Sequence, residues 1–282
     1  MIRFVKGHGT ENDFVLLPDP DGALDLTDAL VQRICDRRAG IGADGVLRVV
    51  RSAAHSDSVA MAAQAEWFMD YRNADGSAVE MCGNGIRVFA RFLVAEGLAA
   101  PGHLAIATRD GVKSVRLGRD GDVTVDMGRA VLPGTDRTVT VGEHGWPALE
   151  VDVGNPHAVV FVEDLAGVGP LEEAPVVEPG FPAGVNVEFV ADLGPRHVEM
   201  RVHERGVGET RSCGTGATAV MVAAVRRDGR PTPSGHDGIS YVVDVPGGRL
   251  VVTERADGRL ELAGPAVLVA EGNLDPGWLA EP

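Results

Sequence analysis

Lysine is nearly absent from this 282-residue sequence, and its absence excludes one common class of amino-acid enzyme. The two lysines, Lys6 and Lys113, each lie in a short β-like run. A pyridoxal-phosphate enzyme needs a lysine that forms a Schiff base beside a phosphate-binding loop. Neither lysine has such a neighbourhood, so we expect no pyridoxal phosphate cofactor.

Cysteine is also scarce, and so are positive charge and long apolar runs. There are three cysteines, no Cys-x-x-Cys pair and eight scattered histidines, so we expect neither a disulfide framework nor a metal site. The net charge of −15 argues against nucleic acid as a partner. No run of 18 apolar residues occurs, and the first residues, MIRFVKGHGT, do not resemble a signal peptide. We therefore expect a soluble, cytoplasmic protein that binds no membrane.

Most segments are short and β-branched, and turn residues separate them, which is typical of strands. The predicted strands are Ile2–Val5, Phe14–Leu17, Val46–Val50, Val112–Leu117, Val123–Met127, Ala158–Val162, Val187–Val190, Val198–Val202, Tyr241–Val245 and Arg249–Thr253. Three helices are predicted. They are Asp28–Arg38 after an N-cap at Thr27, Ile86–Ala95, and a segment from about Gly214 to Arg227 that is apolar nearly all round. The apolar surface of the last helix predicts a buried, central position.

A duplication is visible when Cys82 is aligned with Cys213, an offset of 131 (213 − 82). This alignment places Met69–Asn73 opposite Met200–Glu204. Upstream, Asn12 faces Asn155 and Gly45 faces Asn186, at offsets of 143 and 141, so that the landmarks are collinear. The Gly-rich turn LGRDGDV, near residues 117–126, is the expected junction between the two copies.

The sequence therefore predicts an α+β fold of two pseudo-symmetric halves. In each half a strongly curved, mainly antiparallel sheet wraps around a central helix, and the active site is expected in a cleft between the halves. The N-terminal half is predicted to span residues 1–119, with a C-terminal strand, 267–282, returning to it. The other half spans 120–266.

The three cysteines have different contexts. Cys35 lies on the apolar stripe of a predicted helix, where a buried thiol behaves as a small hydrophobic residue. Cys82 and Cys213 each precede a helix within a Cys-Gly-x-Gly turn. A helix N-terminus lowers the pKa of a thiol, and the glycines let N–H groups approach an anion such as a carboxylate.

Two such turns, related by duplication, could place two thiols on opposite walls of one cleft. Inverting a carbon that bears a hydrogen requires a base on one face and an acid on the other, and a thiolate and a thiol can exchange these roles. The helix N-termini can hold the substrate carboxylate and stabilise negative charge that develops on it. This chemistry is cofactor-free racemisation or epimerisation of an amino acid.

At these residues the sequence resembles the diaminopimelate epimerase family over nearly its whole length. The landmarks are GTENDF (9–14), GIGADG (40–45), NADGSAVEMCGNGIR (73–87), GNPH (154–157), GVNVEF (184–189), ERGVGETRSCGTGA (204–217) and GPAVLV (264–269). The resemblance implies interconversion of LL- and meso-diaminopimelate in lysine and peptidoglycan-precursor synthesis. It implies no cofactor and no metal, and a homodimer is the expected assembly.

The resemblance also implies residue roles. Cys82 and Cys213 would be the acid/base pair, and Asn12 would help to hold the reacting amino group. The N–H groups that would bind the reacting carboxylate are those of Gly83, Asn84, Gly214 and Thr215. The residues that would recognise the distal end of the substrate are Asn73, Asn155, Asn186, Glu204 and Arg205, and those that would tune the thiols are His157 and Glu204.

Two departures from the family pattern accompany these roles. Glu11 brings an extra negative charge, and Gly45 replaces a glutamine that contacts the substrate in some members. Four alternatives remain at this point. A proline or hydroxyproline racemase shares the two cysteines but typically has histidine where this chain has Asn84. A histidine-type or broad amino-acid racemase on the same fold is the second. The others are a non-catalytic binding protein for small zwitterions and a redox protein with a switchable Cys82–Cys213 disulfide.

Overall fold

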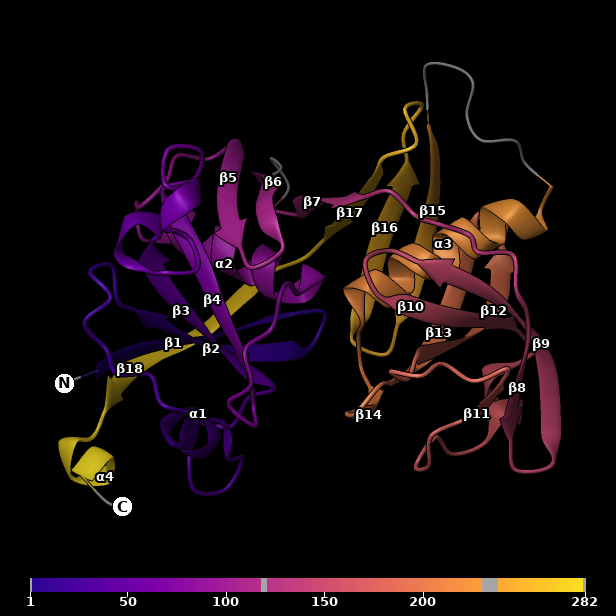
Figure 1. The fold of residues 1–282 in the computed structure, drawn as a ribbon, viewed down its shortest axis with the longest axis horizontal. Helices are drawn as coiled ribbons and strands as arrows, with labels where there is room; N and C mark the ends of the chain where they lie inside the picture. The colour runs from indigo at the N-terminus through magenta and orange to yellow at the C-terminus, as the bar shows by residue number, and fades with distance from the viewer. Residues whose placement is uncertain (1, 118–120, 230–237, 281–282) are drawn as a thin grey trace. The chain divides into compact units, whose positions relative to one another are not determined.

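The computed structural model describes residues 2–117, 121–229 and 238–280 (Figure 1). The chain forms two compact units, one made of residues 1–125 and 265–282 and the other of residues 126–264. The sequence-based boundaries were 119/120 and 266/267, and residues 118–120 of the expected junction turn lie outside the described residues. No helix in the described residues is long and apolar enough to cross a membrane.

The first unit is a curved sheet with a helix against it. Its strands, in spatial order, are β18 (Val267–Leu274), β1 (Ile2–Gly9), β2 (Asn12–Pro18), β3 (Gly45–Arg51), β4 (Trp67–Asn73), β5 (His103–Thr108), β6 (Gly111–Leu117) and β7 (Val123–Gly128), through which the chain leaves the unit. The β2–β3 and β4–β5 pairs are parallel and the others are antiparallel. Its helical segments are α1 (Asp28–Cys35), η1 (Ser52–Ala54), η2 (Val59–Met61), α2 (Gly83–Ala95) and α4 (Pro276–Ala280).

The second unit repeats this arrangement. Its strands, in spatial order, are β11 (Val176–Glu178), β8 (Asp136–Val141), β9 (His144–Asp152), β10 (Pro156–Phe161), β12 (Asn186–Gly194), β13 (His197–Glu204), β15 (Ile239–Val245), β16 (Gly248–Glu254) and β17 (Leu260–Gly264), with the short β14 (Gly208–Thr210) also paired to β13. Here β10–β12 and β13–β15 are the parallel pairs. Its helices are η3 (Leu165–Val168) and α3 (Gly214–Arg227).

The strand registers carry the same offsets as the sequence repeat. In the first unit Phe14 of β2 lies opposite Gly45 of β3, and in the second His157 of β10 lies opposite Asn186 of β12. These pairs differ by 143 (157 − 14) and 141 (186 − 45) positions, the offsets found in the sequence. The α+β class and its two similar halves are therefore confirmed.

A buried helix occupies the concave side of each sheet. Helix α2 contacts β1, β2, β3, β4, β6 and β18, whereas α3 contacts β9, β10, β12, β15, β16 and β17 (Figure 1). Alanine and valine cover nearly the whole surface of α3, and eleven of its residues are buried. Burial of this apolar surface drives each sheet to wrap around its helix, because each valine removed from water contributes about 1.5–3 kcal/mol.

The predicted starts of α1 and α3 are confirmed, but one predicted start and one predicted end are wrong. Helix α2 begins at Gly83 rather than Ile86, because the Cys82 side chain caps it before the apolar spacing begins. Thr27 caps α1, since its Oγ1 accepts from the Leu30 N–H at 3.2 Å. The helix stops at Cys35 rather than at Arg38 because the Asp36 carboxylate accepts from the N–H groups of residues 38 and 39 at 2.7 and 2.6 Å. This local turn competes with helix propagation. Cys35 itself is 5% exposed in the core, as expected.

Candidate functional site

Cys82 caps the N-terminus of α2 with its side chain. Its backbone is extended, with φ −140° and ψ 120°, and its Sγ accepts from the Gly85 N–H at 3.3 Å. The N–H groups of Gly83 and Asn84 belong to the first turn of the helix, where no acceptor exists within the helix. They lie at the positive end of the helix dipole, which favours an anion there.

Cys213 repeats this arrangement at the start of α3. Its φ is −125° and its ψ is 116°, and its Sγ accepts from the Gly216 N–H, also at 3.3 Å. Gly214 and Thr215 then supply the first-turn N–H groups. Each unit therefore presents a thiol that caps the first turn of a buried helix in the same geometry.

Asn12, at the start of β2, lies beside the first thiol. Its Oδ1 is 3.8 Å from the Sγ of Cys82 and accepts from the Nδ2 of Asn84 at 3.2 Å. Its Nδ2 donates to Asp44 at 2.7 Å. Asp44 thus fixes the orientation of the Asn12 amide so that the carbonyl oxygen faces the thiol. Asp44 is not among the site residues predicted from the sequence, although it lies within the GIGADG landmark.

Asn73 ends β4 and contacts Tyr71 rather than the thiol. The Tyr71 hydroxyl donates to the Asn73 Oδ1 at 3.0 Å, and the Asn73 Nδ2 donates to Ser77 at 3.2 Å. A Cβ at Gly45 would lie 2.5 Å from the Arg72 carbonyl oxygen and 2.7 Å from Cε2 of Tyr71. No side chain can therefore fit at position 45, and the Tyr71 ring occupies the adjacent space.

The second thiol lies among acidic and polar groups. The Asn186 Nδ2 is 3.9 Å and the Thr215 Oγ1 3.4 Å from the Cys213 Sγ. Burial raises the pKa of Cys213 well above its usual value, and the negative charges of Glu204 and Glu188 add to the rise. Burial also raises the pKa of the Glu204 carboxyl group, against the hydrogen bonds that it makes with Thr210 and Cys213.

His157 is held between two oxygen atoms in the core of the second unit. Its Nδ1 is 2.6 Å from Glu188 Oε1, and its Nε2 is 3.1 Å from Asn155 Oδ1. The His157 and Glu188 side chains are fully buried. A Cβ at Gly216 would lie 2.8 Å from Glu188 Oε1, so this carboxylate lies directly against the turn that carries Cys213. Glu188 is not among the site residues predicted from the sequence, where its only signal is an acidic residue within the strand-like GVNVEF landmark.

Glu204 and Arg205 are neighbours in the chain but point to different surroundings. The Glu204 carboxylate accepts from Thr210, whereas the exposed Arg205 donates from its Nη1 to the Ala183 carbonyl at 2.9 Å. The backbone N–H of Arg205 donates to Asn186 Oδ1 at 2.9 Å. A Cβ at Gly184 would lie 2.8 Å from the Arg205 Cδ, so glycine there leaves room for the arginine stem.

Both lysines form ion pairs with aspartates. Lys6 pairs with Asp13 at 2.6 Å, and Lys113 pairs with Asp110 at 2.5 Å. Within residues 2–117, 121–229 and 238–280, no group of three or more histidine, cysteine, aspartate or glutamate side chains could hold a metal ion.

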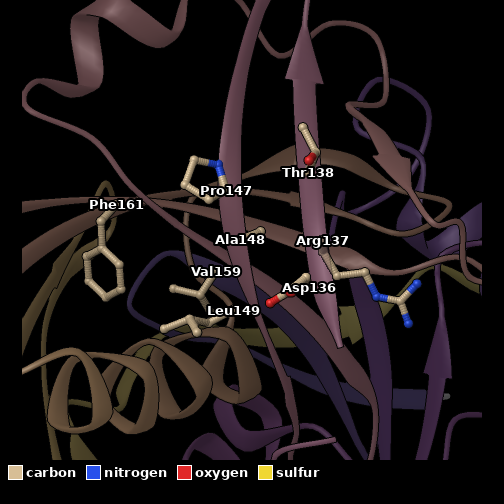
Figure 2. Close-up of a pocket in the computed structure, with 8 residues that line it drawn as sticks. All are labelled: Asp136, Arg137, Thr138, Pro147, Ala148, Leu149, Val159 and Phe161. Carbon is tan, nitrogen blue, oxygen red and sulfur yellow. The ribbon is translucent and has the colours of Figure 1, made fainter. Parts of the chain in front are cut away.

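A separate hollow of about 400 Å³ lies on β8, β9 and β10 of the second unit (Figure 2). It is lined by Asp136, Arg137, Thr138, Pro147, Ala148, Leu149, Val159 and Phe161. Arg137 is engaged with Glu150 at 2.8 Å. None of the predicted site residues lines this hollow.

Solved structures share the fold at low sequence identity. A phenazine biosynthesis protein of the PhzF family from Bacillus anthracis matches with a TM-score of 0.71 and 18% identity, covering 97% of this chain and 99% of that one. A hydroxyproline epimerase from Agrobacterium vitis matches with a TM-score of 0.64 and 16% identity, covering 98% and 93%. At these identities the likeness establishes the fold alone.

Sequence comparison establishes the class and then the family. A diaminopimelate epimerase from Streptomyces coelicolor is 62% identical over 99% of this chain and 97% of its own length. One from Thermobifida fusca is 49% identical over 97% and 98%. The protein is accordingly an epimerase, which is an isomerase. The sequence model of diaminopimelate epimerase matches residues 4–133 and 149–269, and the chain belongs to the diaminopimelate epimerase family.

Proposed function

We propose that this protein interconverts LL- and meso-diaminopimelate by a two-base mechanism that uses two cysteines and neither pyridoxal phosphate nor a metal. The observation that carries the proposal is the matched pair of thiol caps, each with its Sγ 3.3 Å from the N–H three residues later. The product serves lysine and peptidoglycan-precursor synthesis.

Cys82 and Cys213 act on opposite faces of one α-carbon. The thiolate of one removes the α-proton, forming its S–H bond and leaving the C–H electron pair on the carbon. The thiol of the other gives its proton to the opposite face and becomes the thiolate. The roles exchange in the reverse direction, so no other acid or base is needed.

The first turns of α2 and α3 hold the α-carboxylate. In the transition state the electron pair on the α-carbon spreads onto the carboxylate oxygens, where the N–H groups and helix dipoles stabilise it. The N–H groups assigned to this role are those of Gly83, Asn84, Gly214 and Thr215. Asn12, whose amide lies beside Cys82, binds the reacting amino group.

The distal amino-acid end of the substrate is recognised by amides and a pair of opposite charges. The residues assigned to it are Asn73, Asn155, Asn186, Glu204 and Arg205. The Asn186 amide supports this role because it lies at once beside Cys213 and the Arg205 backbone. Glu204 and His157 also tune Cys213, and the contact of Glu204 with this thiol supports that second role.

We place the enzyme in the cytoplasm as a homodimer without nucleic-acid or membrane partners. The net charge of −15 supports the absence of a nucleic-acid partner, and the lack of a disulfide among the three cysteines supports the cytoplasm.

The proposal is tested by following α-hydrogen exchange of LL- and meso-diaminopimelate in D₂O with the purified protein. We expect exchange at both isomers that persists in EDTA and hydroxylamine. Loss of exchange in either reagent, with the fold intact by circular dichroism, would contradict the cofactor-free mechanism. Proline and trans-4-hydroxyproline are the control substrates, and faster exchange of either would favour the alternative racemase.

A further inference from the structure

Arg87 is a buried cation at the base of the turn that carries Cys82. It lies one helical turn into α2 and is 0% exposed. Its Nη1 donates to the Gly83 carbonyl and to Asn84 Oδ1, both at 3.0 Å. Its Nη2 donates to Thr10 Oγ1 at 3.1 Å and its Nε to the Pro265 carbonyl at 3.3 Å. All four acceptors are neutral.

The guanidinium has no carboxylate within ion-pair distance among the described residues. Burying an unpaired cation costs several kcal/mol, and buried arginines are normally matched by an anion. Burial lowers the pKa of Arg87 to about 10, and the negative groups that oppose this are the Cys82 thiolate first and Asp122 second. The hydrogen bonds of Arg87 lead to this thiol. Arg87 donates to Gly83 and Asn84, the two residues that follow Cys82. Asn84 donates to Asn12, whose Oδ1 lies 3.8 Å from the Cys82 Sγ, so the positive charge of Arg87 bears on Cys82.

The other half has the opposite electrostatics. The position equivalent to Arg87, five residues after the cysteine, is Thr218, which donates to the Gly214 carbonyl at 2.8 Å. A buried, neutral threonine thus stands where the first unit has a buried cation. The charged groups that bear on Cys213 are Glu204 of β13 and Glu188 of β12, with His157 of β10 beside both. Two carboxylates oppose a thiolate at this position.

We propose that Arg87 is a positioning residue that keeps Cys82 as a thiolate in the resting enzyme, while the carboxylates around Cys213 keep that residue as a thiol. This inference rests on the proposed function of the two cysteines as the acid/base pair.

The asymmetry assigns the first proton transfer. In the resting enzyme Cys82 removes the α-proton from the isomer whose hydrogen faces it, and Cys213 delivers its own proton to the opposite face. The enzyme then holds a Cys82 thiol and a Cys213 thiolate. Proton exchange with water returns it to the resting form, in which the charge is again matched to Arg87.

A structural role for Arg87 predicts different behaviour. Its bond to Thr10 secures the turn between β1 and β2, and a Cβ at Gly9 would lie 3.0 Å from its Nη2. If Arg87 contributed only this hydrogen bond, any replacement would loosen the turn between β1 and β2. The charge of the replacement would then have no effect on the ionisation of Cys82.

The test measures the pH dependence of iodoacetamide alkylation at each cysteine without substrate, using peptide mass spectrometry. The variants are Arg87→Met, which removes the charge, and Arg87→Lys, which retains it. Thr218→Val is the matched control in the other half. In the wild type we expect alkylation of Cys82 to inflect at a lower pH than that of Cys213. Arg87→Met should raise the Cys82 inflection by about one pH unit or more, and Arg87→Lys by much less.

Thr218→Val should leave the Cys82 inflection in place. The proposal is overturned if Cys82 inflects at or above Cys213 in the wild type, or if Met and Lys at position 87 shift the Cys82 inflection equally. If Arg87→Met does not fold, the proposal is still tested by the order of the Cys82 and Cys213 inflections in the wild type and by the Cys82 inflection in Arg87→Lys. The alkylation test uses no substrate. A negative result there would overturn the role of Arg87, whereas loss of diaminopimelate exchange would overturn the proposed function.

Discussion

Replacing Gly216 by alanine should damage the second thiol site, whereas the equivalent change at Gly85 should not. Both glycines lie three residues after a cysteine, inside the first turn of a helix, with backbone angles that alanine can adopt. At position 216 the new Cβ would be 2.8 Å from Glu188 Oε1, about 0.6 Å closer than ordinary contact at 3.4 Å. The Glu188 carboxylate would have to move and would stretch its 2.6 Å bond to His157.

Three effects set the change in the free energy of unfolding caused by Gly216→Ala. Alanine stabilises a helix by up to about 1 kcal/mol relative to glycine. Overpacking costs about 1–3 kcal/mol, and a hydrogen bond to a charged group is worth about 1.5–3 kcal/mol. We therefore expect Gly216→Ala to lower the free energy of unfolding by about 2 kcal/mol, and kcat/KM to fall by about tenfold or more as the Cys213 turn shifts.

Gly85→Ala is the matched control. Its Cβ would meet the flexible Leu47 Cδ2 at 3.3 Å and the Phe14 Cζ at 3.5 Å, which small shifts accommodate. The free energy of unfolding should stay within about 1 kcal/mol of wild type. Urea unfolding and epimerisation kinetics measure both variants. Equal effects at the two positions, or a stabilised and fully active Gly216→Ala, would refute the reasoning from Glu188.

Three further substitutions have defined outcomes. Arg205→Lys keeps the charge but loses the planar guanidinium that can bind a carboxylate through two hydrogen bonds. We expect kcat/KM to fall by about 100-fold, or about 3 kcal/mol of transition-state stabilisation, with little change in the free energy of unfolding. A variant that is unfolded but has unchanged kinetics would show that the residue is structural. Cys35→Ser should leave the kinetics unchanged but reduce stability by about 1–3 kcal/mol, because the hydroxyl replaces a buried thiol whose pKa burial raises to about 11. Glu204→Gln removes a negative charge that disfavours the Cys213 thiolate, so the pKa of this thiol should fall and its alkylation should inflect at lower pH; an upward shift would contradict the assignment.

The parts of the fold that could be predicted from the sequence are those set by local pattern and by the repeat. The helices after Cys82 and Cys213 follow from apolar spacing, and the offsets of 143 and 141 reappear as strand register. The predicted end of the first helix is wrong because the Asp36 side chain accepts hydrogen bonds from the backbone in a competing turn. Apolar periodicity contains no sign of such a turn.

The electrostatic surroundings of the thiols could not be predicted because their contacts are distant in sequence. Arg87 meets Thr10 and Pro265, which are 77 and 178 positions away. Glu188 and His157 are 31 residues apart on different strands, and neither stands out as a buried partner of the other before the strands pair. Sequence pattern reveals which residues can do chemistry, whereas their tuning depends on tertiary contacts.

The most direct test of the two-base account is isomer-specific α-hydrogen exchange in the single variants Cys82→Ser and Cys213→Ser. A serine hydroxyl is close to a thiol in size but is a much weaker acid, so each variant should lose most epimerisation. Each should still exchange the α-hydrogen in D₂O from the one isomer whose hydrogen faces the remaining cysteine, in the fraction of molecules in which that cysteine is ionised, and the two variants should prefer opposite isomers. The same preference in both variants, or undiminished epimerisation in either, would contradict the account.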